Sequence, residues 1–236
     1  MNEHTIRPVA HIESDFPEEF GIPRQAGIVG ELSARVVFDG EFRSDEALRG
    51  IEGFSHLWLI WHFSASDRES WSPTVRPPRL GGNVRMGVFA TRSPFRPNSL
   101  GLSCVELAGI ETRPGLGTVL VARGADLMDG TPIFDVKPYI PYADAHPDAR
   151  SGFAPDAGTT LDVRISDTLL LKIPEDKRAA LRGVLANDPR PRYQKDPDRV
   201  YAMDFAGLTV RFIVSGSVLT VVDIGPQGGK ANDKKR

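Results

Sequence analysis

Side chains that could bind an anion gather in one stretch of the chain, Val75 to Leu107. It holds five arginines against one acid, although the formal net charge of the whole chain is only -2. An arginine guanidinium presents a planar fork of N–H donors that matches two oxygens of a phosphate or carboxylate. The prolines and glycines around these arginines favour a binding loop over a solvated helix face. The alternative is that the arginines pair with carboxylates elsewhere or lie in solvent. They are Arg76, Arg79, Arg85, Arg92 and Arg96.

Carboxylates gather in a second stretch, 124–142, where Asp126, Asp129 and Asp135 lie within ten positions. An ionised carboxylate only accepts hydrogen bonds, so it can hold a ligand hydroxyl, amine or N–H group. It can equally satisfy the backbone amides of a turn, and the residue types leave both readings open. Upstream, Pro23-Arg24-Gln25 joins a stiff backbone to a cation and an amide, a combination suited to a polar ligand.

Several kinds of chemistry lack their motifs. The chain has no Walker A loop, no HExxH, no G-x-S-x-G elbow and no cysteine pair, and its five histidines lack metal-ligand spacing. No metal is therefore expected. Gly115-Leu116-Gly117 lacks the third glycine of a dinucleotide loop, which favours a hairpin turn. The single Cys104 fits a reducing compartment as a buried filler, and no window reaches the roughly 20 apolar residues of a membrane span. We therefore expect a cytoplasmic protein without a membrane partner.

The elements that would position these side chains are mostly strands. β-branched, alternating or apolar runs predict strands at 6–14, 31–38, 54–63, 86–91, 100–107, 118–126 and 131–136. Arginine loops at 75–83 and 92–98 bracket the strand at 86–91. If that strand pairs with 100–107, the arginines come near one edge of the sheet, although alternating side chains prevent all from converging.

A composition change after residue 143 indicates a second unit. A linker rich in Asp, Ala, Pro and Gly at 143–158 precedes a strand at 161–166, a helix that begins near Pro174 and three strands joined by short turns. The predicted domains are therefore 1–145, mainly β, and 159–225, small and α+β, with a disordered tail at 226–236. Another Arg/Pro loop contributes Arg190, Arg192 and Lys195. Arginine loops in both units favour RNA, whose bases could stack on Phe89, Phe95 or Tyr193.

Five sequence blocks together closely resemble the TsaA-like (TrmO) family of tRNA methyltransferases. They are PRQ at 23–25, GFSHLW at 53–58, TVRPPRLGGNVRMGVFATRSPFRPNSLGLS at 74–103, DLMDGTPIFDVKPYIPY at 126–142 and DPRPRY at 188–193. The resemblance implies an N-terminal β-barrel that binds S-adenosyl-L-methionine without a Rossmann sheet, a small C-terminal domain and a homodimer. It also implies methyl transfer to N6 of threonylcarbamoyladenosine at position 37, in the tRNA anticodon loop (t6A37, giving m6t6A).

The same resemblance implies the roles of individual residues. The implied cofactor contacts are Pro23, Arg24, Gln25, Ser64, Arg92, Leu102, Gly124, Ala125, Asp126, Leu127 and Asp129. At Ser64-Ala65 the chain departs from the family pattern, in which a His-Gln pair stands at these positions. Asp126 and Asp129 are the candidates for orienting or deprotonating the target nitrogen. The implied RNA face is Arg76, Arg79, Arg85, Arg96, Arg190, Arg192 and Lys195. Two alternatives stay open: a non-catalytic RNA-binding module, and a methyltransferase that uses the same cofactor on another substrate.

Overall fold

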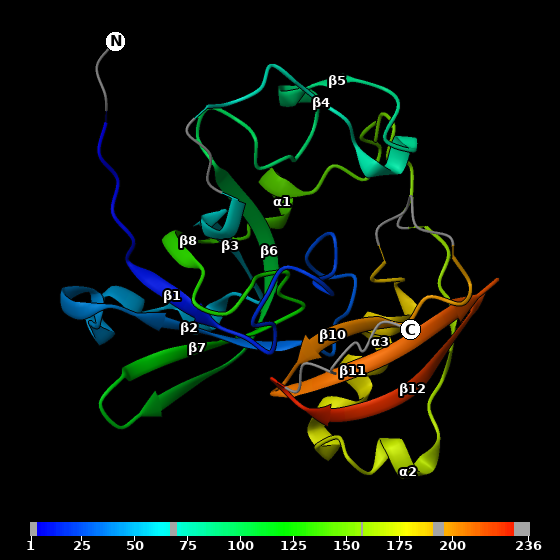
Figure 1. The fold of residues 1–236 in the computed structure, drawn as a ribbon. Helices are drawn as coiled ribbons and strands as arrows, with labels where there is room; N and C mark the ends of the chain where they lie inside the picture. Colours follow the sequence, from blue (N-terminus) through cyan, green and yellow to red (C-terminus); the bar gives the residue numbers. More distant parts are fainter. Residues whose placement is uncertain (1–3, 67–69, 157, 191–195, 229–236) are drawn as a thin grey trace.

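Six strands form a closed antiparallel barrel in the N-terminal part of the chain (Figure 1). The computed structural model describes residues 4–66, 70–156, 158–190 and 196–228. Around the barrel the strand order is β1-β2-β7-β6-β3-β8, and β1 closes the ring on β8. Each of the six pairings is antiparallel. The bounds are β1 (Ala10–Glu13), β2 (Ser33–Phe38), β3 (His56–His62), β6 (Leu100–Arg113), β7 (Gly117–Arg123) and β8 (Pro132–Pro138). The prediction of a mainly β protein is confirmed, and the first sheet is a closed barrel, as the family resemblance implied.

The barrel interior is filled by side chains that alternate along each strand. In β3, Leu57, Leu59 and Trp61 are buried, whereas the residues between them are not. This period of two sends one set of side chains into the barrel. The predicted hairpin at Gly115 to Gly117 is confirmed, because the Leu116 N–H donates to the carbonyl of Arg113 and both glycines have positive φ. Short 3-10 turns lie at Gly40–Phe42, Asp45–Leu48, Ile51–Gly53, Ser64–Ser66 and Pro78–Leu80.

The predicted strand at 86–91 is wrong. Only Met86–Gly87 is a strand (β5), and Val88–Ala90 turns as a 3-10 helix. β5 pairs with β4 (Thr74–Val75) and not with β6, which lies between β3 and β7. Phe89 lies in this turn and is 73% exposed, so its side chain does not pack in the barrel core. The arginine loops therefore belong to the chain between β3 and β6, which extends from one end of the barrel in Figure 1. We call this segment, described at 63–66 and 70–99, the excursion.

A second sheet with the order β10-β11-β12-β9 follows the barrel. The predicted three-strand meander is confirmed as β10 (Tyr201–Phe205), β11 (Leu208–Ser215) and β12 (Val218–Pro226), while β9 (Asp162–Arg164) joins β12 in parallel. Pro226, assigned to the tail, ends β12, and 229–236 lies outside the described residues. The helices are α1 (Pro141–Asp144), α2 (Asp167–Leu170) and α3 (Arg178–Ala186), with a 3-10 turn at Glu175–Lys177. The predicted domain boundaries stay predictions.

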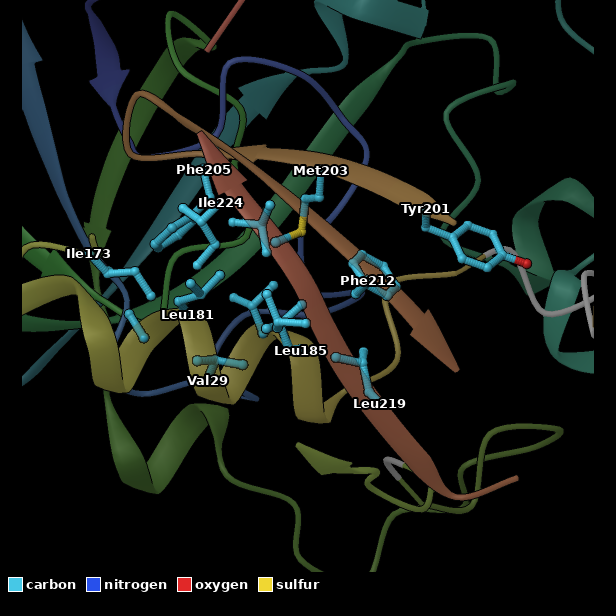
Figure 2. Packing of buried hydrophobic residues seen from close by; sticks show 14 of the residues in the cluster. Val29, Ile173, Leu181, Leu185, Tyr201, Met203, Phe205, Phe212, Leu219 and Ile224 are labelled. Atoms are coloured by element: carbon cyan, nitrogen blue, oxygen red, sulfur yellow. The ribbon is translucent and has the colours of Figure 1, made fainter. Parts of the chain in front are cut away.

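The core of this second sheet includes residues from the N-terminal loop 14–32. Leu181 and Leu185 of α3 pack against the sheet, and Val29 lies beside them (Figure 2). Phe16 is buried in the same cluster, where its ring meets Phe205 edge-on with centroids 5.3 Å apart. The 14–32 loop is therefore held by both units of the chain.

Candidate active site

A cavity of about 700 Å³ opens at one end of the barrel, and we refer to it as the barrel-end pocket. β3 finishes here at His62, directly opposite Leu100, where β6 begins. One wall comes from the 14–32 loop and another from the segment before β6. The lining polar residues include Glu19, Arg24, Gln25, His62, Ser64, Arg92, Arg96, Asn98, Asp126 and Thr131, and the lining apolar residues include Trp61, Phe63, Phe89, Leu100, Leu102 and Met128. Its size is typical of a small-molecule site.

Asp126 is the lining residue with the most perturbed environment. Its Oδ1 accepts a hydrogen bond of 2.6 Å from the Ser103 hydroxyl, which is buried. Burial raises the pKa of the Asp126 carboxyl, while the Ser103 bond, the backbone N–H groups of Asp126 and Ala26, and the charge of Arg92 lower part of that rise. A carboxylate kept in such a setting beside a cavity is a candidate for binding or proton transfer.

The raised pKa gives a prediction for stability. Since folding disfavours the carboxylate, the ionised wild-type side chain costs free energy at pH values above the raised pKa. Asp126→Asn carries no charge and can still accept the Ser103 bond, so we expect a higher free energy of unfolding at about pH 8. The gain should shrink as the pH falls through the folded pKa towards the ordinary value, where the wild-type carboxyl is also neutral. Urea denaturation across this range measures it.

Asp144→Asn is the matched control because the sign is opposite. Bonds from the Ile140 N–H and the Trp58 indole lower the pKa of Asp144, so its carboxylate is favoured by folding. The asparagine variant should therefore lose stability at about pH 8 and approach the wild type in acid. If both variants shifted stability in the same direction, this account of Asp126 would be wrong.

Arg92 meets the Pro23-Arg24-Gln25 triplet across the pocket. Its Nη1 donates to Oε1 of Gln25, and Nε2 of Gln25 donates to the carbonyl of Arg24. Arg24 in turn donates from Nη2 to the carbonyl of Arg190, 3.4 Å away in the second unit. Two segments 67 positions apart are thus joined at the pocket wall, as the sequence-based assignment of both to one site requires.

The other predicted cofactor contacts divide into two groups. Seven line the pocket: Pro23, Arg24, Gln25, Ser64, Arg92, Leu102 and Asp126. Gly124, Ala125, Leu127 and Asp129 are not among the described residues that line it. Ala125 and Leu127 are buried in the barrel core, and Gly124 has a positive φ where its backbone crosses Gly27. Asp129 is exposed, and its Oδ1 accepts from the Ser14 N–H at 2.9 Å. The roles of all eleven residues in cofactor binding stay predictions.

The described residues of the predicted RNA face differ in their exposure and in their partners. Arg76 and Arg85 are exposed on the excursion, whereas Arg79 is partly buried and pairs with Asp156 at 2.6 Å. Arg96 lines the pocket and donates to the Thr91 carbonyl at 3.1 Å. Arg190 forms a two-point contact with Asp188. Arg192 and Lys195 lie outside the described residues.

Ser103 and Trp61 are site residues that the sequence-based assignment missed. Both belong to barrel strands that were recognised as apolar or β-rich runs. Ser103 could have been found from the sequence as a polar residue at an inward position of a strand, between Gly101 and Val105. A polar side chain at a core position needs a hydrogen-bond partner.

Two negative findings apply to the part of the chain that the structure describes. No group of three or more His, Cys, Asp or Glu side chains could hold a metal ion there. None of the helices found there is both long and apolar enough to cross a membrane.

Family models account for both units of the chain. The tRNA-methyltransferase O N-terminal domain matches residues 11–145, and the TrmO C-terminal domain matches residues 159–227. These matches, together with named relatives, place the chain in the class of S-adenosylmethionine-dependent tRNA methyltransferases. Within that class, the chain belongs to the tRNA-methyltransferase O (TrmO) family.

Named relatives and solved structures agree with this assignment. The tRNA (adenine(37)-N6)-methyltransferase of Escherichia coli K12 is 38% identical and covers 96% of this chain and 100% of its own. A putative S-adenosylmethionine-dependent methyltransferase, RcsF, of Pseudomonas aeruginosa is 40% identical over 89% of this chain and 92% of its own. A crystal structure of TrmO from P. aeruginosa superposes with a TM-score of 0.77 at 32% identity, covering 95% of this chain and 100% of that one.

Proposed function

We propose that this protein transfers a methyl group from S-adenosylmethionine to N6 of threonylcarbamoyladenosine at position 37 of tRNA. The observation that carries the proposal is the barrel-end pocket, in which Asp126 and the Arg92–Gln25 pair face one cavity. Family membership supports a tRNA adenine-37 substrate, and the threonylcarbamoyl group is the finer part of the proposal. We also propose that the protein acts in the cytoplasm as a homodimer, as the family resemblance implies.

The pocket residues fit the chemical groups of the cofactor. Guanidinium groups of Arg24 and Arg92 suit its carboxylate, and the carboxylate of Glu19 suits its ammonium or ribose hydroxyl groups. The negative charge of an ionised Asp126 favours binding of a positively charged cofactor and leaves the side chain available to the substrate. Trp61 and Phe63, with ring centroids 4.2 Å apart, add aromatic surface that favours a positive centre such as a sulfonium. When bound, S-adenosylmethionine supplies an electrophilic methyl group on that positively charged sulfur.

The protein's part in the reaction is to align the target nitrogen and remove its proton. N6 of the substrate is a weak nucleophile because the carbamoyl group withdraws electrons, so alignment accounts for much of the acceleration. Asp126 would accept a hydrogen bond from N6–H, orient the nitrogen and take its proton as the N–C bond forms and the bond between the methyl carbon and sulfur breaks, which leaves a neutral thioether. The raised pKa of Asp126 makes its carboxylate a better proton acceptor than an ordinary aspartate.

The pocket rim supports a nucleic-acid substrate. Phe89 lines the pocket, is 73% exposed and stacks on Trp71 with ring centroids 6.3 Å apart. Exposed aromatic rings of this kind stack on unpaired bases of an RNA loop. Arg76 and Arg85 lie exposed in the same excursion, where they can meet phosphates.

The double variant Arg76→Ala/Arg85→Ala should weaken tRNA binding and leave cofactor binding unchanged. Removing two phosphate contacts is expected to lower tRNA affinity by roughly tenfold at moderate salt and to reduce the slope of log affinity against log salt by about 1 to 2. Filter binding across a salt series measures both. Arg49→Ala is the matched control, since Arg49 is exposed but pairs with Glu46 three residues away, outside the excursion. An equal loss in the control would refute the assignment.

Calorimetry and methyl transfer with purified protein test the proposal as a whole. We expect S-adenosylmethionine to bind the wild type and its methyl group to appear at N6 of threonylcarbamoylated tRNA. A protein that bound tRNA but not the cofactor would be an RNA-binding module. A protein that bound the cofactor without methylating this tRNA would act on another substrate.

A further inference from the structure

Three side chains form a directed chain of hydrogen bonds beneath the barrel-end pocket. The Trp61 indole Nε1–H donates to Oγ of Ser103 at 3.0 Å, and the Ser103 hydroxyl donates to Oδ1 of Asp126 at 2.6 Å. Trp61 is 8% exposed and Ser103 is 2% exposed. An indole N–H can only donate, so it occupies a lone pair of the serine oxygen. The hydroxyl proton of Ser103 is therefore left to point at Asp126.

Strand register explains why these groups meet. Trp61 lies opposite Gly101, so Ser103 follows two positions along β6 on the same inward face. Gly101 has no side chain, which leaves room for the indole against the β6 backbone. On the other side, the backbone of Asp126 is fixed between two buried neighbours, Ala125 and Leu127. The geometry is thus set by two neighbouring barrel strands, β3 and β6, and by the segment that follows β7.

We propose that Ser103 is a positioning residue for methyl transfer: its hydroxyl, oriented by Trp61, holds Asp126 in the carboxylate form and fixes the rotation of that carboxylate toward the pocket. The inference rests on the proposed function above and adds a role for two barrel residues. Ser103 acts through Asp126 and has no contact with substrate of its own.

The charges around Asp126 set the direction of the expected effect. Burial raises the pKa of Asp126, and the Ser103 bond is the largest influence that opposes it, ahead of the amides of Asp126 and Ala26 and the charge of Arg92. His62 from β3, Arg96 from the segment before β6, and Glu19 and Arg24 from the 14–32 loop are the other charged or titratable groups lining the pocket. Without the Ser103 hydroxyl, less remains to counter the effect of burial on the pKa of Asp126. The pKa of Asp126 must then rise further, and the carboxylate is lost at a higher pH.

The test compares the wild type with Ser103→Ala by two readouts. The first is NMR titration of the Asp126 carboxyl carbon in protein without cofactor. The second is calorimetric affinity for S-adenosylmethionine as a function of pH. In Ser103→Ala we expect the titration midpoint to move to higher pH, the acid limb of cofactor binding to move with it, and affinity on that limb to fall by about tenfold. An unchanged midpoint would overturn the proposal.

Thr209→Val is the matched control. Thr209 is also a buried hydroxyl that donates to an aspartate, Asp204 Oδ1 at 2.5 Å, but it lies in the second sheet. Its removal should leave the Asp126 midpoint and the cofactor profile unchanged. Ser103→Thr retains the hydroxyl and should restore the wild-type midpoint, whereas a threonine midpoint equal to that of alanine would contradict a hydroxyl-specific role.

Trp61→Phe keeps the test usable if Ser103→Ala does not fold. It removes the indole N–H and releases the serine proton from its fixed direction, so we expect a smaller upward shift of the same midpoint. If the Asp126 midpoint did not move in this variant, Trp61 would have no role in orienting Ser103. If the wild type bound no S-adenosylmethionine, the proposed function would fail, while the titration midpoints would still decide whether Ser103 controls Asp126.

Discussion

Gly101→Ala is expected to disrupt the barrel-end pocket and to lower the free energy of unfolding by roughly 2 to 4 kcal/mol. A Cβ at Gly101 would lie 2.2 Å from Cε2, 2.4 Å from Cζ2 and 2.5 Å from Cδ2 of Trp61. The ring is rigid, 8% exposed and hydrogen-bonded to Ser103, so it cannot move aside without breaking the contact that leads to Asp126. Cofactor binding should therefore fall below detection in calorimetry, and chemical denaturation measures the loss of stability.

Gly109→Ala is the control for this change. Gly109 lies in the same strand, and a Cβ there would have no heavy atom within 4 Å. Its free energy of unfolding should stay within about 0.5 kcal/mol of the wild type, and cofactor affinity should not change. Equal losses in the two variants would show that the strand backbone, and not the Trp61 contact, sets the requirement for glycine.

Gly21→Ala is expected to destabilise the protein by roughly 2 to 4 kcal/mol and to weaken cofactor binding from a distance. Gly21 has a φ of +102°, and a Cβ there would lie 2.2 Å from Sδ and 2.6 Å from Cγ of Met203 in β10. Met203 is fully buried in the second core. The 14–32 loop that carries Gly21 also carries the Pro23-Arg24-Gln25 wall, so displacing it from β10 should misplace that wall. Denaturation and calorimetry measure the two effects.

Two further variants separate the clash from backbone strain. Gly27→Ala shares the positive φ, +78°, but its Cβ would have no heavy atom within 4 Å, so it should lose only about 1 kcal/mol. The double variant Gly21→Ala/Met203→Ala should show less than additive loss because the alanine at 203 removes the clashing atoms. Strict additivity would refute a direct role of the Met203 contact.

The parts of the fold that sequence patterns predicted are those set by local periodicity. The β3 run and the β10–β12 meander follow from alternating or continuous apolar residues next to turn signals. The strand predicted at 86–91 is wrong because that prediction also relied on local pattern alone. Its apolar letters satisfy the pattern, but Gly87 leads into a turn and Phe89 projects to solvent. Local composition does not show whether a neighbouring strand is available to pair with a segment.

The parts of the site that could not be predicted depend on partners far along the chain. Arg79 is paired with Asp156, and Arg113 with Glu13 across 100 positions, and nothing near either residue identifies these partners. The same holds for Trp61, Ser103 and Asp126, which meet only when β3, β6 and the segment after β7 close into a barrel. Residue type and spacing made Asp126 and Arg92 candidates, and the family resemblance assigned them to the cofactor site. The hydrogen bonds that orient Asp126 required the structure.

The central claim is tested most directly by nucleoside mass spectrometry of tRNA from a strain that lacks this gene. The account predicts that N6-methylated threonylcarbamoyladenosine disappears while its unmethylated precursor remains. The wild-type gene should restore the methylated nucleoside. Asp126→Asn, which we expect to fold and to be at least as stable as the wild type at neutral pH, should not restore it. An unchanged level of the methylated nucleoside in the deletion strain would contradict the account.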